Sequence, residues 1–592
     1  GVTFASTLDI TDGSPGTLTV TDTENGSDII FNGAVTLEAV SFAQTGYDLV
    51  FNGTGNVFTN AVTFQNTGTL TLGNNTNDTF TFNGGLTENT TGTVTLASTI
   101  DSSNDDITFG AITLAAATEL DTNATDTNGD IIIGAVTGAN NNLTLDTTTT
   151  TGSADNTFTG DINLGSGALS VTGDVVLGAN VSVTATPGSG VGIRFNDAVN
   201  ADNASSNDRT LTLNAGTSSS IQVTGTVGNS QALAGLTVTQ SIGASFINTV
   251  DVSDSNSGTI TLTDTTDGGN IIFHSNVTAD TFTTAAQGYD IFLLNNTTFA
   301  NAVTFQNTGT LDLGNATSDT LTFNGGLTES TSGTVTIDGT IVSSDDAISF
   351  GNINLGEDLS VTSAGGAISI GTITGSASAS QPDDITITSS GGSANTVAVG
   401  AISNNINTVA ITGSTSVTLN GNITTNNTSG NSVTLVGTTT NGANITIDTN
   451  NTSNDGAINI ASFSSSNNNL ALDSGTADIT LSGATFNLGS GSLTTTGDIN
   501  LANNVSITAT GGMTINNKID ADDASSNDRT LTLNSGTGST MTFNNAIGST
   551  EPLAGLTITQ SDGVTFNNTL NVTDGSAGTL TVTDTEDGSD II

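Results

Sequence analysis

The sequence predicts an all-β protein, and within that class a right-handed parallel β-helix (β-solenoid), elongated, with coils of roughly 20–24 residues. Three observations support this prediction. The composition is that of short strands and tight corners, a short apolar motif returns about once per coil, and a long repeat accepts a large insertion.

The composition favours strands and turns. The 592 residues include 71 Gly, only 4 Pro and no Cys. Thr, Val, Ile and Phe suit a pleated, half-buried surface, whereas Asn, Gly, Asp and Ser are turn residues. A hydrophobic content of 34% is low enough to raise the question of disorder. However, apolar residues alternate with Thr in runs such as 17–21 and 210–213, which is the period-2 pattern of strands.

A short motif of the form apolar-x-apolar-x-x-apolar, often with Gly in fourth or fifth place, recurs along the chain. It begins, among other places, at Ile107, Ile131, Ile348, Ile368 and Val397. Most spacings lie between 18 and 29 residues, but Leu49 to Val62 spans 13 and Val417 to Ile458 spans 41. Such a period is typical of solenoids. We expect aromatic stacks along the bore from Phe residues at motif positions: Phe31, Phe51, Phe64 and Phe82.

The first thirty residues return at the end of the chain. Residues 563–592 differ from residues 1–30 at six positions, and a looser copy starts at Gly243. We therefore predict one continuous solenoid over residues 1–592, with long repeats at 1–242 and 243–562 and the start of a third at 563–592. The second repeat carries about 78 extra residues near 340–490, which a solenoid accommodates because each coil contacts only its neighbours. A string of immunoglobulin-like sandwiches is the rival, but its units are near 100 residues.

The two ends of the sequence fall at the same point of the long repeat. Ile591-Ile592 aligns with Ile29-Ile30, which continue into Phe31. An open last coil would expose apolar side chains and unpaired backbone groups. We therefore expect either a piece of a longer repeat protein or identical units that self-associate head to tail along the solenoid axis.

The charge is strongly acidic. Four Lys and Arg residues face 55 Asp and Glu residues, which gives a net charge of −51. This balance argues against nucleic acid and against an anionic membrane surface as partners. No apolar run approaches the length of a membrane span, so no membrane insertion is expected in this segment.

The motif runs, of the form [IV]-x-[FIV]-x-G-x-[IV] and poor in Lys, resemble the repeats of bacterial filamentous-haemagglutinin-type exoproteins and autotransporter passenger domains. The resemblance implies an exported right-handed β-helix at the cell surface or in an extracellular fibre. We accordingly expect a structural extracellular repeat segment, a surface adhesin stalk or a fibre or filament of a giant cell-surface protein, with another cell surface or a polysaccharide as a further partner. The alternative is a carbohydrate-binding or carbohydrate-active β-helix.

No set of residues suggests catalysis. His274 is the one histidine, and the first copy has Asn32 in its place. Lys518 and Arg194 are expected to stand alone, and Arg209 and Arg529 to form local ion pairs with the adjacent Asp208 and Asp528. A catalytic site needs a base and positioning groups that converge. We therefore predict no catalytic residue and no enzyme activity.

Calcium is the one cofactor that the sequence suggests. Calcium takes six to eight oxygen ligands, which Asp/Asn/Gly loops supply. The candidate ligands lie in three such loops: Asp22, Glu24, Asn25 and Asp28; Asp121, Asp126, Asn128 and Asp130; and Asp584, Glu586, Asp587 and Asp590. Acidic pairs such as Asp105-Asp106 and Asp383-Asp384 are interpreted as solvated turn residues.

Overall fold

The computed structural model describes most of the chain and contains strands but no helix in that part. The described residues are 1–12, 16–21, 24–123, 129–148, 154–202, 209–254, 257–376, 382–391, 395–425, 432–451, 454–465, 467–522, 529–574, 578–583, 586 and 588–592. Within these ranges no helix is long and apolar enough to cross a membrane.

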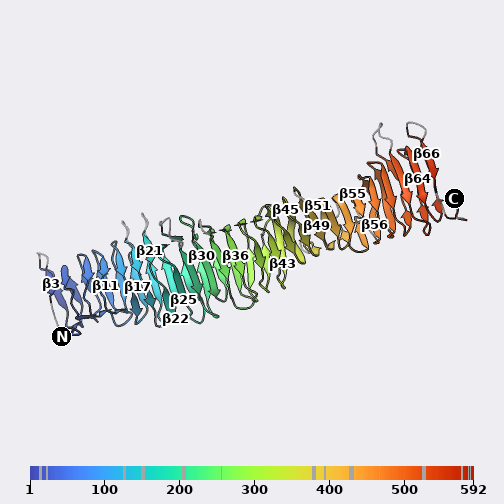
Figure 1. Ribbon diagram of the computed structural model, residues 1–592. Helices are drawn as coiled ribbons and strands as arrows, with labels where there is room; N and C mark the ends of the chain where they lie inside the picture. The colour runs from blue at the N-terminus through green and yellow to red at the C-terminus, as the bar shows by residue number, and fades with distance from the viewer. Residues whose placement is uncertain are drawn as a thin grey trace. The chain divides into compact units, whose positions relative to one another are not determined.

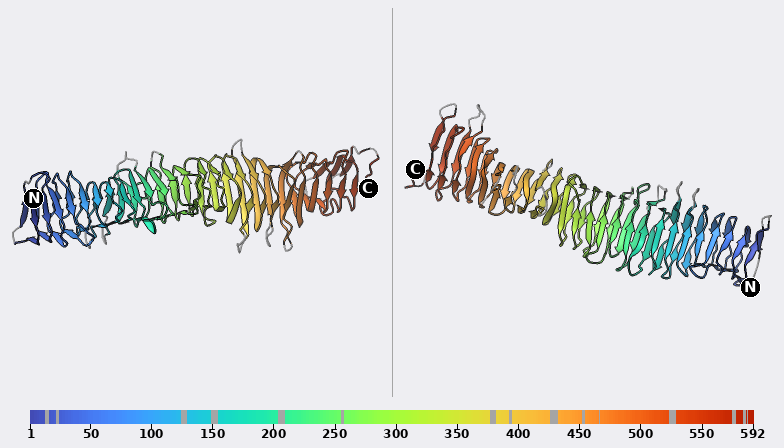
Figure 2. Two further views of the ribbon diagram at one scale, coloured as in Figure 1. Left: turned by 90° about the horizontal axis from the view of Figure 1, so that it is seen from below. Right: turned by 180° about the vertical axis from the view of Figure 1, so that it is seen from behind.

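The chain divides into two compact units. Unit 1 comprises Gly1–Phe299 and Phe305–Thr310, and unit 2 comprises Ala300–Thr304 and Leu311–Ile592. In each unit the strands of successive coils lie side by side and pair in parallel (Figures 1 and 2). The predicted fold, a parallel β-solenoid, is therefore confirmed.

A coil of unit 1 has three short strands, so the unit has three faces, here named A, B and C. Face A consists of β1 (Val2–Phe4), β4 (Asp28–Phe31), β7 (Asp48–Phe51), β10 (Leu70–Leu72), β13 (Val94–Leu96), β16 (Ile112–Leu114), β19 (Val136–Thr137), β22 (Ile162–Gly165), β25 (Val181–Ala185), β28 (Thr210–Asn214), β30 (Gly235–Gln240), β33 (Thr259–Leu262) and β36 (Thr281–Thr284). Face B consists of β2 (Leu8–Ile10), β5 (Val35–Leu37), β8 (Asn56–Phe58), β11 (Thr79–Phe82), β14 (Thr99–Asp101), β17 (Thr118–Asp121), β20 (Leu143–Asp146), β23 (Leu169–Thr172), β26 (Val191–Phe195), β29 (Ser220–Val223), β31 (Ala244–Phe246), β34 (Asn270–Phe273) and β37 (Asp290–Leu293). Face C consists of β3 (Thr17–Val20), β6 (Ala39–Phe42), β9 (Val62–Phe64), β12 (Leu86–Glu88), β15 (Ile107–Phe109), β18 (Ile131–Ile133), β21 (Asp155–Phe158), β24 (Asp174–Leu177), β27 (Val199–Ala201), β32 (Val250–Val252), β35 (Val277–Ala279) and β38 (Thr297–Phe299), with Val227 bridging β27 to β32.

Unit 2 is built in the same way, on faces D, E and F, but several of its strands run round a corner. Face D has β42 (Leu327–Glu329), β44 (Ile348–Phe350), β46 (Ile368–Ile370), β49 (Thr396–Val399), β57 (Thr485–Asn487), β59 (Val505–Thr508), β62 (Thr530–Asn534), β64 (Gly555–Gln560) and β66 (Thr579–Val582). Face E has β40 (Leu311–Leu313), β47 (Ile373–Thr374), β50 (Ile402–Ser403), β52 (Ile423–Thr424), β54 (Ile445–Asp448), β60 (Met513–Ile515), β63 (Met541–Phe543) and β65 (Val564–Phe566), and face F has β41 (Thr320–Phe323), β48 (Asp383–Ser389) and β61 (Ile519–Ala521). The strands that run from face E to face F are β43 (Val335–Ser343), β45 (Ile353–Ser363), β56 (Leu470–Leu481) and β58 (Leu493–Leu501). Those from face F to face D are β51 (Ile406–Leu419), β53 (Ser432–Asn441) and β55 (Ala457–Ser464), and β39 (Val303–Phe305) falls at the division of the units.

The bore of each unit is filled by the inward half of every strand. In β7, Leu49 and Phe51 are fully buried, while Asp48 and Val50 are only half-buried. Burial of a Leu or Phe side chain stabilises the fold by about 1.5–3 kcal/mol. Because successive side chains of a strand point to opposite faces, every second residue of each strand is buried in the bore. The expected Phe stacks form: Phe31 stacks on Phe51 with ring centroids 4.6 Å apart, Phe42 on Phe64 at 5.1 Å and Phe58 on Phe82 at 4.8 Å.

The number of residues per coil varies because the corners vary. The smallest step between paired residues is 18, from Val94 to Ile112, and the largest is 30, from Val181 to Leu211. The two motif spacings that did not fit now have an explanation. Leu49 lies on face A and Val62 on face C, so 13 residues separate two faces of one coil. Likewise Val417 pairs on face D with Thr439, whereas Ile458 lies on face F, so the 41 residues between them do not make a whole number of coils.

The three copies of the opening sequence pair alike. Val2 pairs with Ile29, Ala244 with Ile271 and Val564 with Ile591. Within unit 1, however, the first copy opens on face A with β1 and the second opens on face B with β31. Successive segments of the chain fall on the three faces in turn. Thirty strands, β1 to β30, and the bridge residue Val227 precede β31. These 31 segments are one more than a multiple of three, so β31 falls on face B.

Candidate functional site

The residues predicted to bind calcium are described only in part. Asp22, Asp126, Asn128, Asp584 and Asp587 lie outside the described residues. In the first loop Glu24 and Asn25 are exposed, the backbone N–H of Gly26 donates to Gly46 O at 2.8 Å, and Asp28 pairs with Asp48 of the next coil. In the last loop Glu586 donates its N–H to Ser561 O, and Asp590 O accepts from Val564. Among the described residues no group of three or more His, Asp or Glu is placed to hold a metal ion, so the calcium assignment stays a prediction.

Asp121 and Asp130 of the second loop belong to different faces. Asp121 ends β17 on face B, in register with Asp101 of β14 and Asp146 of β20. Each of these three carboxylates accepts the backbone N–H two residues further on, from Ser103, Asn123 and Thr148. The pKa of Asp121 is raised to about 6, chiefly by burial; the Asn123 N–H opposes the rise, and the charges of Asp146, Asp101 and Glu119 add to it. Asp121, the middle carboxylate of these three, therefore takes up a proton more readily than an ordinary Asp.

Asp130 belongs to a second carboxylate ladder, at the start of the face C strands. The backbone N–H of Asp130 donates to Asp106 Oδ1, and that of Asp155 donates to Asp130 Oδ1, both at 3.0 Å. Ala198 donates in the same way to Asp174 Oδ1 at 3.1 Å. Each carboxylate thus ties its own coil to the next one.

The same tie is made by Asn elsewhere, because Asp and Asn share an Oδ1 acceptor. Asn side chains accept the N–H of a residue in the next coil at 2.9–3.0 Å in both units: Asn142 from Ala168, Asn180 from Thr210, Asn200 from Ser230, Asn352 from Thr372, Asn422 from Thr446 and Asn504 from Thr530. The acidic pairs are therefore not merely solvated, since Asp106 and Asp384 both make this bond. An Asp or Asn directly before an apolar-x-apolar run is the sequence signal that would have predicted it.

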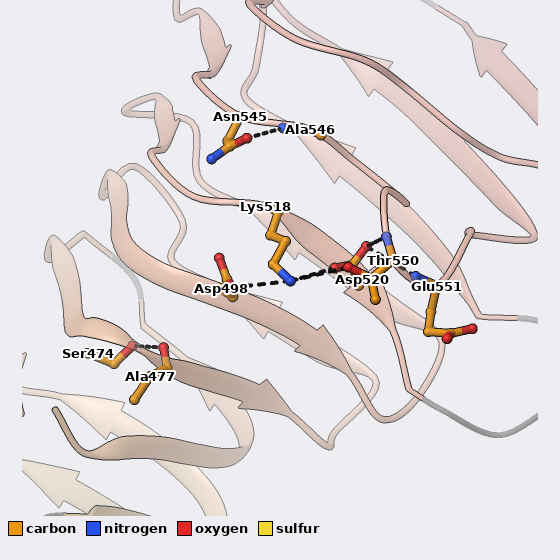
Figure 3. Close-up of polar contacts among 9 residues, drawn as sticks. All are labelled: Ser474, Ala477, Asp498, Lys518, Asp520, Asn545, Ala546, Thr550 and Glu551. Carbon is orange, nitrogen blue, oxygen red and sulfur yellow. Dashed lines mark hydrogen bonds and ion pairs between the residues drawn. The ribbon is translucent and has the colours of Figure 1, made fainter. Parts of the chain in front are cut away.

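The Lys518 patch is a charged hollow on the outside of unit 2. It is a shallow cavity lined on face F and its edge by Asp478, Asp498, Asn500, Lys518, Asp520, Thr550 and Glu551. Figure 3 shows the Lys518 side chain pointing between Asp498 and Asp520. Lys518 Nζ lies 3.3 Å from Asp498 Oδ2, 3.4 Å from Asp520 Oδ2 and 3.2 Å from Thr550 Oγ1. The expectation that Lys518 stands alone is wrong, because Asp498 and Thr550 reach it from the neighbouring coils and Asp520 reaches it from two residues further along the chain.

Lys518 acts as the counterion of stacked carboxylates. Burial alone would lower the pKa of Lys518, but Asp498 and Asp520 raise it above its usual value through charge and hydrogen bonding. Asp520 also accepts the N–H of Thr550 at 3.0 Å, so the patch retains the tie between coils. A lysine held in its charged form is a poor nucleophile, and the arrangement serves pairing rather than proton transfer.

Arg209 and Arg529 form a matched pair of bidentate ion pairs. Arg209 Nε and Nη2 donate to Asp202 at 2.9 and 2.5 Å, and Arg529 donates to Asp522 at 2.9 and 2.6 Å. The described partner of each Arg is therefore the Asp seven residues earlier, and the expected pairing with the adjacent Asp stays a prediction. Asp208 and Asp528 themselves lie outside the described residues. His274 is exposed, like Asn32, and the N–H groups of both donate across to the preceding coil, to Phe246 O and Phe4 O.

Comparison of the chain with family models, with curated proteins and with solved structures finds no match. The resemblance to filamentous-haemagglutinin-type and autotransporter repeats therefore stays a prediction.

Proposed function

We propose that the chain is a structural, non-catalytic segment of an extracellular bacterial surface protein, serving as a stalk or fibre that holds other parts at a distance. The observation that supports this proposal is the use of its polar side chains. In both units Asp and Asn side chains at the corners accept hydrogen bonds from backbone N–H groups of the next coil, along the direction of stacking.

Such bonds strengthen the solenoid along its stacking direction. Each intramolecular hydrogen bond contributes about 0.5–1.5 kcal/mol, and more when the acceptor is charged. A spacer benefits from many equal ties that depend little on which of Asp or Asn is present. An acidic surface adds solubility and self-repulsion. Further coils of the same kind, another cell surface or a polysaccharide are the partners that this role implies.

Labelling of intact cells that carry the native protein tests the proposal. Antibodies against the described surface of unit 1 should label filaments or a surface layer in electron micrographs, and external protease should remove the label. Label confined to the cell interior would contradict the proposal.

The alternative, a carbohydrate-binding or carbohydrate-active β-helix, is distinguished by a polysaccharide binding and turnover screen. Binding that is lost on substitution of the Lys518 patch, in a protein that is otherwise folded, would favour the alternative. The calcium prediction is checked separately by melting at fixed ionic strength in chelator and in about millimolar calcium, the range of weak extracellular sites; equal melting would rule it out.

A further inference from the structure

A second set of carboxylates in unit 2, here named the Asp338 corner, has no basic partner. It consists of Asp312 on β40, Asp338 within β43, Glu357 and Asp358 on β45, and Asp383 on β48. No Lys, Arg or His occurs in the sequence between His274 and Lys518. The Asp338 corner therefore differs from the Lys518 patch, where a lysine lies among the stacked carboxylates.

Asp338 is enclosed at this corner. Its residue is 8% exposed, and its Oδ1 atom has no hydrogen-bond partner among the described residues. Gly356 in the next coil packs against the carboxylate so closely that a Cβ atom at position 356 would overlap it. Gly314 in the preceding coil lies against the Asp338 carbonyl in the same manner.

The neighbouring acids are buried to different degrees. Asp312 Oδ1 is also inaccessible and without a hydrogen-bond partner, while Asp383 is 2% exposed and accepts the N–H of Ser376 at 2.6 Å. Glu357 and Asp358 are exposed on the same bend of β45. Asp319, the remaining acid of this corner, is occupied by the N–H groups of Asn315 and Ala316.

Burial of an unpartnered carboxylate oxygen costs several times more free energy than burial of a neutral polar atom, and protonation to a carboxylic acid removes the part of the cost that is due to the charge. We infer that the Asp338 corner is a proton-operated clamp: it takes up protons in mildly acidic solution and then holds the coils of β40, β43, β45 and β48 together more firmly than at neutral pH.

The direction of the titration agrees with this geometry. The pKa of Asp312 is raised to about 6, first by burial and then by the charge of Asp338. Burial also raises the pKa of Asp338 to about 6, with Glu357 and Asp383 adding to the rise and the amides of Glu357 and Gly356 opposing it. For Asp383 the pKa is likewise raised, first by burial, against the Ser376 N–H, and then by Asp358, Glu357 and Asp384. Since an unfolded Asp titrates near 3.9, the stabilisation is complete below that value and is lost as the pH rises through about 6.

Unit 1 contains a matched region without the clamp. In the repeat alignment Thr71 replaces Asp312, Ala97 replaces Asp338, and Ala115, Ala116 and Ala117 replace Gly356, Glu357 and Asp358. The backbone pairing is the same, since Thr99 pairs with Glu119 in unit 1 and Thr340 with Ser360 in unit 2. Residues 70–96 are therefore an internal control for residues 311–337.

Hydrogen exchange of the full chain, in chelator and expressed as protection factors, tests the inference. From about pH 7.5 to pH 5, protection of residues 311–337 should rise about tenfold for each carboxyl that titrates, and that of residues 70–96 should rise less. The D312N/D338N variant mimics the protonated corner, so it should show high protection at both pH values. D312N alone, which keeps the Asp338 carboxyl, should show about half of the pH response on a logarithmic scale.

Three results would overturn the clamp. They are equal pH responses in the two regions, an unchanged pH response in D312N/D338N, and an increase in protection at neutral pH when about millimolar calcium replaces the chelator. The last result would show that a cation rather than a proton is the natural counterion of this corner.

Discussion

The Lys518 patch of unit 2 has a counterpart without lysine in unit 1, the Ala198 patch. It consists of Asp155, Asp174, Val176, Ala198, Asn200, Ser230 and Gln231, which align with Asp478, Asp498, Asn500, Lys518, Asp520, Thr550 and Glu551. The backbone is the same in both. Gly228 N donates to Val199 O and Gly548 N to Ile519 O, each at 2.7 Å, and the next tie runs to Asn200 Oδ1 or Asp520 Oδ1, each at 3.0 Å.

The main difference between the two patches lies in their charged residues. Where Asn200 becomes Asp520 and Gln231 becomes Glu551, Ala198 becomes Lys518. The fold needs only an Oδ1 acceptor at this position, so sequence drift can add a carboxylate, and a lysine two residues before it then compensates for it. The lesson is that hydrogen-bond geometry sets the coil, while charge is adjusted locally around it.

Substitutions in the core beneath both patches should lower the stability most. Ile519 and its counterpart Val199 are buried, at 2% and 0% exposure. Ile519→Ala should lower the local free energy of opening by about 3 kcal/mol and Val199→Ala by about 2 kcal/mol, because each leaves a cavity in a packed row. Hydrogen exchange of the flanking strands measures both. A loss below about 0.5 kcal/mol in either would show that the bore is not close-packed there.

Removal of a bidentate Arg ion pair should have the next largest effect on stability. Arg529→Ala should cost about 1 kcal/mol near neutral pH, since the pair is only partly exposed. Arg529 holds the pKa of Asp522 below its usual range, so the contribution is present above about pH 4 and is lost as the pH falls through the lowered value. Arg209→Ala is the matched control and should cost the same. Unequal costs would show that equal geometry does not mean equal energy here.

Removing the patch lysine should have a smaller effect. Lys518→Ala should cost about 0.5–1 kcal/mol, because the lysine side chain is about a third exposed and its pairs are screened. The loss should shrink in about 1 M salt, where the Debye length is about 3 Å. Ala198→Lys in unit 1 should change stability by only a few tenths of a kcal/mol, since Asn200 offers no charge. An effect of Lys518→Ala that is independent of salt would point to packing rather than to charge.

The smallest effect is expected from exchange of the acceptor itself. Asp520→Asn keeps the Oδ1 that receives the Thr550 N–H and removes one charge beside Lys518, so it should cost a few tenths of a kcal/mol. Asn200→Asp places a second charge near Asp174 without a lysine and should cost a similar amount. Thermal melting of the two variants checks this. A loss above about 2 kcal/mol in either would mean that the acceptor is not interchangeable.

The class of fold and the residues that fill the bore can be predicted from the sequence alone. Strand length, the alternation of Thr with apolar residues and the period of the motif follow from local rules that act within a few residues. The stacks of Phe31 on Phe51 and of Phe58 on Phe82 follow once the coils are in register.

Which residues become neighbours in adjacent coils depends on the folded structure and does not follow from the sequence pattern. Corners differ in length, so the step between paired residues varies from 18 to 30 and cannot be read from an average period. This variation places the second copy on face B rather than face A, brings Asp498 and Asp520 to Lys518, and leaves Asp338 without a basic partner. The candidate calcium ligands were identified from spacing within loops, whereas the carboxylates of Asp106 and Asp130 are committed to the N–H groups of the next coil, because parallel stacking presents a row of backbone donors at every corner.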